Sequence, residues 1–168
     1  MRLCLAVLAV TAVTLFAACD RQVITSTGNT ANGVLPAVNC SDPASYDVKL
    51  ATGGLPGVDV TSQGTVVQPI AVPSSYEVPG FTLNWAKKTE RGFDISIEFG
   101  DRIYFGKRLI FECRKDAFYL TNIDVESFDK NNLTKKKHKL VDIKPPMPLA
   151  KFRVADQTTD ASNAGLNP

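Results

Sequence analysis

The chain has 168 residues, of which 44% are hydrophobic and 21% are charged, and its formal net charge at pH 7 is +2. This length is that of one ordinary domain. A net charge so close to zero provides no basic field that would attract nucleic acid, so we exclude nucleic-acid binding as the function.

The N-terminal segment has the composition of an export signal. A positive charge at Arg2 precedes an uncharged, mostly apolar run of sixteen residues from Leu3 to Ala18, which lies directly before Cys19. One charge, an apolar core of about this length and small residues at the end are the three parts of a signal peptide. We therefore predict that residues 1–18 form a signal peptide.

The end of this segment, Leu15-Phe16-Ala17-Ala18-Cys19, resembles the lipobox of bacterial lipoproteins. The resemblance implies that Cys19 carries fatty acyl chains such as palmitate and becomes the first residue of a lipid-anchored protein facing the periplasm. Asp20 resembles the residue that keeps some lipoproteins of Gram-negative bacteria in the inner membrane. It favours that membrane, with the outer membrane as the alternative.

Two other interpretations of this segment stay open. An ordinary secretory signal would be cut near Ala18 and would leave no lipid anchor. A retained transmembrane helix would have to cross about 30 Å of hydrocarbon, whereas sixteen residues rise only about 24 Å. The length of the run therefore favours cleavage.

Four cysteines are present, and two of them are left once the signal and the anchor are assigned. Cys4 would be lost with the signal peptide and Cys19 would carry the lipid. A remaining pair in an oxidising compartment persists as a disulfide, so we predict a bond between Cys40 and Cys113. A redox-active or metal-binding pair would need close spacing such as C-x-x-C, which these two residues lack.

Both ends of the mature chain are poor in bulky apolar residues. Such composition cannot bury enough surface to offset the entropy lost on ordering the backbone. We predict a flexible tether at 19–39 and a disordered tail at 155–168, with a β domain at 40–154 between them.

The first half of the β domain predicts short strands. Four β-branched or aromatic runs are bounded by glycine and proline: Tyr46–Thr52, Val58–Ser62, Thr65–Val72 and Gly80–Ala86. Pro69 places the third run at a sheet edge, because proline cannot donate to a ladder. We assign the Trp85 side chain to the core, together with the aromatic residues Tyr104, Phe105 and Tyr119.

The second half predicts longer strands. Phe93–Phe99 alternates between apolar and polar residues, as a half-buried strand does. Ile103–Arg114 follows as one strand or a pair, with Gly106 as a bulge. With Ala117–Phe128 these runs predict a three-stranded antiparallel meander. Leu133–Ile143 predicts a last long strand and Lys151–Val154 a short one.

No helix is predicted beyond the signal. The pattern therefore predicts an all-β domain, either an antiparallel sandwich or a strongly curved sheet of about seven to nine strands.

No pattern of catalytic or metal-binding residues stands out. His138, the single histidine, lies among lysines, and we interpret it as a solvated side chain. Asp94 and Glu98 share a strand face about 13 Å apart, farther than the roughly 5–10 Å of a glycosidase pair. The acidic segment 124–132 lacks the central glycine and the final glutamate of an EF-hand loop. We expect no cofactor, no metal and no enzymatic activity.

Charge is concentrated in one basic run and one acidic stretch. The lysines would either contact an acidic protein or an anionic membrane, or protect an edge strand from pairing. We take both segments as candidate partner-binding residues: Lys135, Lys136, Lys137 and Lys139 in the run, and Asp124, Glu126 and Asp129 in the stretch.

These features predict a non-enzymatic protein-binding module of the cell envelope. It would be an immunity or inhibitor lipoprotein, or an accessory subunit of an envelope or secretion machine, and its partner would be another envelope protein. The alternative is a small-ligand-binding or hydrolytic envelope protein whose site is assembled from distant residues.

Overall fold

The computed structural model describes residues 38–52, 55–159 and 165. The predicted signal peptide, Cys19 and the tether up to residue 37 lie outside these residues, as do residues 160–164 and 166–168 of the predicted tail.

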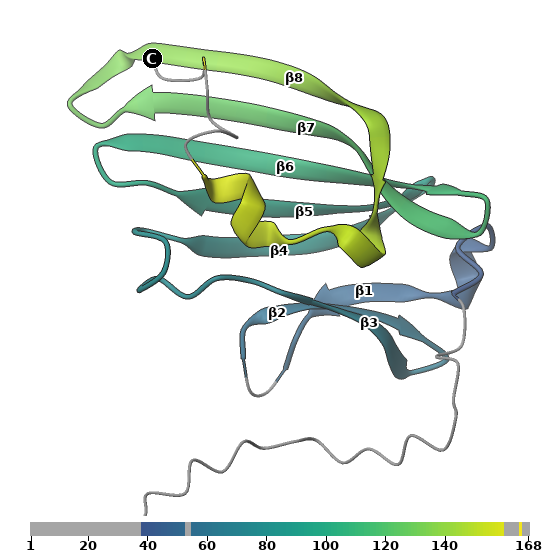
Figure 1. Ribbon diagram of the computed structural model, residues 1–168. Coiled ribbons are helices and arrows are strands. Elements are labelled where there is room, and N and C mark those ends of the chain that lie inside the picture. The colour runs from purple at the N-terminus through teal and green to yellow at the C-terminus, as the bar shows by residue number, and fades with distance from the viewer. Residues whose placement is uncertain (1–37, 53–54, 160–164, 166–168) are drawn as a thin grey trace, which may run out of the picture. The chain divides into compact units, whose positions relative to one another are not determined.

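The described residues form two antiparallel sheets, shown in Figure 1. The smaller sheet has the strand order β1-β2-β3, and the larger one has the order β4-β5-β6-β7-β8. The strands are β1 (Asp47–Leu50), β2 (Gly57–Ser62), β3 (Thr65–Ala71), β4 (Thr82–Thr89), β5 (Gly92–Phe99), β6 (Ile103–Arg114), β7 (Ala117–Asp129) and β8 (Asn132–Pro148). The predicted all-β antiparallel fold and its central meander are confirmed, and β3, with Pro69, lies at a sheet edge.

The core lies between the smaller sheet and one face of the larger sheet. The alternating pattern of β5 buries Phe93, Ile95 and Ile97 completely. Phe93 stacks on Phe111 of β6 with ring centroids 4.7 Å apart, and Phe118 of β7 meets Phe93 edge-on at 4.9 Å. Each such pair contributes about 0.5–1.5 kcal/mol beyond the buried area, so the aromatic residues fix how the central strands pack.

Side chains near β1 and β4 connect the two sheets. The Tyr46 hydroxyl, just before β1, donates a 2.9 Å hydrogen bond to the carbonyl of Gly92 in β5. Lys88 of β4 donates to the carbonyls of Tyr46, at 2.9 Å, and of Pro43. These bonds satisfy backbone groups where the two sheets meet.

The predicted disulfide between Cys40 and Cys113 is present, with its two Cα atoms 5.6 Å apart. Beside it, the Ser41 hydroxyl donates a 2.7 Å hydrogen bond to Asp116 in the turn after β6. The segment that enters the domain is therefore covalently joined to the end of a central strand.

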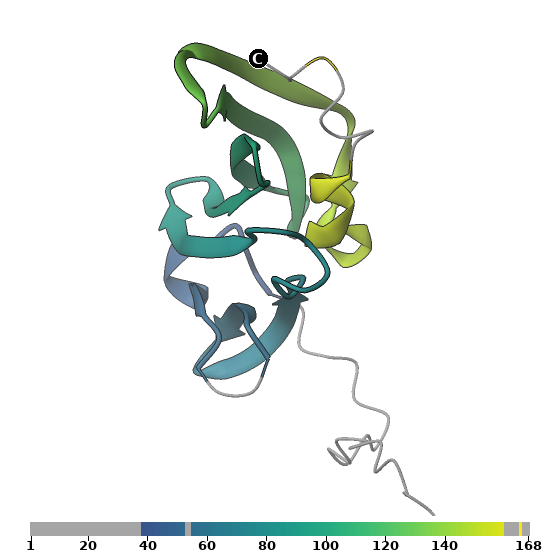
Figure 2. The same cartoon turned by 90° about the vertical axis from the view of Figure 1, so that its left-hand side faces the viewer.

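The chain leaves β8 through two 3-10 helices, η2 (Leu149–Lys151) and η3 (Val154–Thr158). Figures 1 and 2 both show them against the core face of the larger sheet. The strand predicted at Lys151–Val154 is wrong, because the Phe152 amide donates to the Leu149 carbonyl within a turn. Gln157 is buried, so the folded part extends beyond the predicted boundary at Val154 into the segment that we predicted as tail.

The bulge predicted at Gly106 is also wrong. β6 is continuous through this residue, which pairs in regular register with Glu98 of β5 and Glu126 of β7. On both sides of the glycine, every second residue of β6 faces the core: Phe105, Lys107, Leu109 and Phe111. The irregularity between β6 and β7 lies instead at Ile110 and Phe111, where β7 carries the extra residue Thr121.

Candidate functional site

The face of the larger sheet that points away from the core is the main candidate site. We call this surface the outer face, and no described element covers it (Figure 2). Two rows of paired residues cross it. One row consists of Trp85, Ser96, Arg108, Asp124 and Leu140, and the other consists of Glu98, Gly106, Glu126 and His138.

Exposed apolar side chains stand at both ends of the first row. Trp85 on β4 is 40% exposed and Leu140 on β8 is 57% exposed. The assignment of Trp85 to the core is therefore wrong. A register shift between Leu83 and Trp85 leaves Asn84 unmatched and pairs Trp85 with Ser96, which puts the indole on the outer face. Trp is among the residues most enriched in protein-binding hot spots.

An ion pair with one buried partner fixes the middle of the outer face. Asp94 is only 3% exposed, and its Oδ2 accepts from Arg108 Nε at 2.8 Å and lies 2.6 Å from Arg108 Nη2. Two contacts to one carboxylate hold the guanidinium in one orientation. The arginine is therefore presented as a rigid part of the surface.

Two shallow hollows flank this arginine. One, of about 340 Å³, is lined by residues from Thr89 to Glu112. The other, of about 240 Å³, lies around Gly106, where a Cβ would meet nothing within 4 Å. Its polar walls are Ser96, Glu98, Arg108, Asp124, Glu126 and His138.

The second hollow contains a His–Asp pair that the sequence did not reveal. His138 Nε2 lies 2.6 Å from Asp124 Oδ1, fourteen residues away in the chain. The hairpin register brings them together through diagonal positions, since Asp124 is opposite Leu140 and Glu126 is opposite His138. A β-hairpin prediction for β7 and β8 would bring these two segments together. The register shift between Phe128 and Asp129, near the turn, is not visible in the sequence, and it decides which residues lie next to each other.

The outer face also carries two aromatic rings. Tyr104 donates a hydrogen bond to the Glu98 carboxylate. Burial is the main cause that raises the pKa of the Tyr104 phenol, and the Glu98 carboxylate raises it further. The Tyr104 ring lies 4.9 Å from that of Phe128. Lys130 and Lys136 lie over these two rings, at 5.4 and 5.6 Å from the centroids. Tyr104 and Phe128 are thus partly covered by lysine side chains.

Strand alternation splits the basic run between two faces of β8. Lys136 is on the outer face, 3.5 Å from Glu126. Lys137 and Lys139 pair with Ser127 and Val125 and so point to the opposite side. Lys135 lies where the register between β7 and β8 shifts, between the pairs Phe128–Lys136 and Asp129–Asn132.

The predicted acidic residues are divided in the same way. Asp124 and Glu126 are on the outer face with Lys136, whereas Asp129 is buried away from them. A hydrogen bond from the Asn131 amide, and then one from Arg102 at 3.1 Å, lowers the pKa of Asp129. The structure gives Asp129 a role in holding the hairpin turn.

The basic run from Lys135 to Lys139 lies on β8, which is a free edge of the larger sheet. β8 pairs only with β7, and residues 132–140 are all exposed, including Leu133 and Leu140. A row of unpaired backbone groups on an edge strand is able to pair with another chain.

Geometry limits the chemistry of the His138–Asp124 pair. Ser96 is the hydroxyl in the first row, but it lies two strands from Asp124, about 10 Å at about 4.8 Å per strand. A nucleophile must approach its base to about 3 Å. Within residues 38–52, 55–159 and 165, no group of three potential metal ligands is present.

Comparison with known proteins adds no relative: no family model matches the chain, and no curated protein or solved structure is significantly similar to it. In the part of the chain that the structure describes, no helix is long and apolar enough to cross a membrane.

Proposed function

We propose that this protein is a non-enzymatic, lipid-anchored envelope lipoprotein that binds another envelope protein through the outer face and the adjoining edge of β8. The observation that carries the proposal is an uncovered sheet face that presents Trp85, a fixed Arg108 and Leu140 in one row, next to the exposed edge segment 132–140 of β8.

The kinds of residue on this surface support a protein ligand. Trp, Tyr and Arg dominate the energy of protein interfaces, especially where their side chains are already held in place. Arg108 is held by Asp94, and Tyr104 is held by Glu98. Little side-chain entropy would be lost when a partner covers them.

Charge indicates an acidic partner surface. Residues 124–139 contain five lysines and three carboxylates. Those carboxylates are already matched within the chain, to His138, Lys136 and Arg102. The positive excess along β8 would therefore attract an acidic protein and speed its association.

The anchor belongs to the same proposal. Lipids on Cys19 would confine the protein to the envelope membrane, and Asp20 favours the inner one. Mass spectrometry of the native product should find an N-terminal cysteine at position 19 with diacylglyceryl and acyl groups. An unmodified terminus would overturn the anchored part of the proposal and leave the partner-binding part untouched.

The partner-binding part is tested by capture from the native envelope. Tagged protein is cross-linked in place, and the captured proteins are compared with those of a variant with Lys135, Lys136, Lys137 and Lys139 changed to glutamate. We expect one protein to be lost from the variant. Trp85→Ala should reduce capture of that same protein by at least tenfold.

A matched control reverses four other exposed basic residues: Lys49, Lys115, Lys151 and Arg153. Both variants have the same net charge, so only the location of the change differs. Equal loss in the two variants would mean that net charge alone decides capture, and undiminished capture by Trp85→Ala would remove the outer face. Either result overturns the proposed surface.

A further inference from the structure

We propose that the pocket between β3 and the two 3-10 helices binds an amphipathic carboxylate, a molecule with an unbranched apolar chain and one carboxylate head. This site lies apart from the outer face and goes beyond the proposed partner-binding function.

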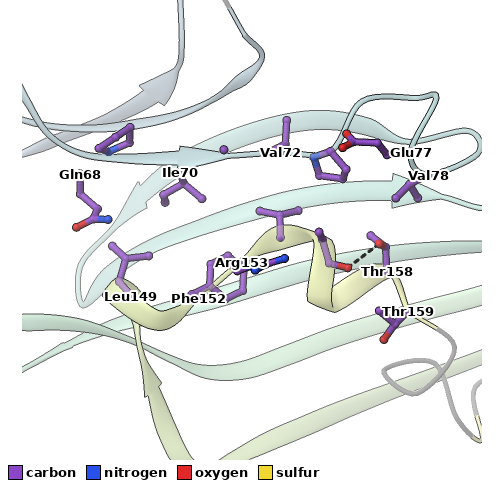
Figure 3. Close-up of a pocket in the computed structure, with 15 residues that line it drawn as sticks. Gln68, Ile70, Val72, Glu77, Val78, Leu149, Phe152, Arg153, Thr158 and Thr159 are labelled. Carbon is purple, nitrogen blue, oxygen red and sulfur yellow. Dashed lines mark hydrogen bonds between the residues drawn. The ribbon is translucent and has the colours of Figure 1, made fainter. Parts of the chain in front are cut away.

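The pocket follows the free edge of β3. It has a volume of about 660 Å³, within the roughly 300–1,000 Å³ of small-molecule sites. One wall is the unbroken segment 68–73, and the facing wall comes from the segment 149–159, as Figure 3 shows. Six consecutive residues include both side-chain directions of a strand, so the pocket runs along the edge and not over one face.

The interior of the pocket is apolar. Its buried lining consists of Ile70, Pro73, Leu149, Phe152 and Val154. Val72 and Val78 extend this apolar surface toward the opening. Each methylene that moves from water into such surroundings strengthens binding about fourfold. An unbranched apolar chain would therefore gain affinity with each carbon that the pocket encloses.

One cation at the rim has unused hydrogen-bonding capacity. Arg153 lies in the facing wall, and Figure 3 shows its side chain extending into the space between the walls. Its Nε is 3.7 Å from Asp156 Oδ1, which is too long for a hydrogen bond. The side chain is 75% exposed, and no described residue accepts a hydrogen bond from it. A guanidinium in this state suits a carboxylate, which accepts two parallel hydrogen bonds.

The opposite rim carries a negative charge. The Glu77 carboxylate accepts from the Ser74 amide at 2.7 Å and from the Ser74 hydroxyl at 3.0 Å. The amide and then the hydroxyl lower the pKa of Glu77, so this carboxyl stays ionised at neutral pH. It would repel a carboxylate, which places the head at Arg153. The two rim charges therefore predict opposite effects on an anionic ligand and none on a neutral one.

The test uses the full chain with decanoate as the probe and decan-1-ol as its neutral counterpart, by isothermal titration calorimetry. We expect decanoate to bind more tightly than the alcohol. Arg153→Gln should weaken decanoate at least fivefold, Glu77→Gln should strengthen it about twofold, and neither should change binding of the alcohol. Any detergent present takes up the same amount of each probe for all variants. Differences in affinity between the variants therefore report binding in the pocket.

A steric variant tests the location. Ala71 is exposed and lines the pocket, so Ala71→Phe should abolish binding of both probes. Ala117 is an exposed residue of β7 that does not line it, and Ala117→Phe should leave binding unchanged. Equal effects of the two phenylalanines would overturn the location. Should Ala71→Phe fail to fold, the charge variants still decide, because decanoate affinity unchanged in Arg153→Gln would overturn the site.

Discussion

The ammonium of Lys107 donates a 2.6 Å hydrogen bond to the carbonyl of Gln157, fifty residues further along the chain. Lys107 is only 2% exposed and lies on the core face of β6, 5.4 Å from the centre of the Phe99 ring. This bond connects a central strand to η3, and so it helps to hold the C-terminal segment on the sheet.

The first prediction is that stability increases with pH because of this lysine. Burial lowers the pKa of Lys107 to about 8, whereas an unfolded chain has a lysine pKa of about 10.4. Between these values the unfolded state binds more protons, so the free energy of unfolding rises with pH by up to about 3 kcal/mol. Urea unfolding at a series of pH values measures the slope.

The control for this slope is Lys107→Met, which keeps the length of the side chain but has no proton to lose. Its stability should vary much less over the same pH range. A slope as steep as that of the wild type would assign the effect to other groups.

The second prediction concerns the Asp94–Arg108 pair. Arg108→Leu leaves a buried carboxylate without its cation, which typically costs about 3–5 kcal/mol for a fully buried pair and less here, because half of the arginine is exposed. The double variant Asp94→Leu/Arg108→Leu should recover most of this loss. Chemical denaturation compares the two, and a double variant no more stable than Arg108→Leu would contradict the explanation.

The third prediction compares Gly100, in the turn between β5 and β6, with Gly106, inside β6. At Gly100, φ is 110° and a Cβ would meet the Ile103 carbonyl oxygen at 2.1 Å, so Gly100→Ala should destabilise by about 2 kcal/mol or more. At Gly106 there is open space, and Gly106→Ala should change stability by less than about 1 kcal/mol. Thermal unfolding distinguishes them, and similar losses at both sites would be inconsistent with these contacts.

The fourth prediction is that the disulfide contributes on the order of 4 kcal/mol, because it closes a long loop between cysteines with a sequence separation of 73. Reduction should lower the unfolding midpoint of the wild type. A Cys40→Ser/Cys113→Ser variant should start at the lower midpoint and not respond to the reductant. If reduction changed that variant equally, the reductant would be acting elsewhere.

The sequence predicted single strands well and their relationships less well. β5 was predictable because each inward position from Phe93 to Phe99 is apolar. The direction of the Trp85 side chain was not predictable. It depends on a one-residue shift in the register between β4 and β5, which the local pattern of apolar and polar residues does not show. The bulge at Gly106 is predicted from its residue type alone, although the core-facing positions on both sides of it, Phe105 and Lys107 to Phe111, keep the same alternation.

The candidate site was predictable only in part. The segments that contain Asp124, Glu126 and Lys136 were identified by charge, but the hairpin offset that joins His138 to Asp124 was not. The pocket at Arg153 could not be anticipated, because it depends on how the segment after β8 folds back across the sheet. Interactions of this kind are set by tertiary packing and not by local periodicity.

The Cys40–Cys113 bond has a mechanical consequence. Any force pulling on the chain from its N-terminal side reaches Cys40 before it reaches β1, and the covalent link passes that load to the end of β6. The short strand β1 is thereby spared from being peeled away one hydrogen bond at a time. A domain held from that end would resist tension with the interior strands of its larger sheet.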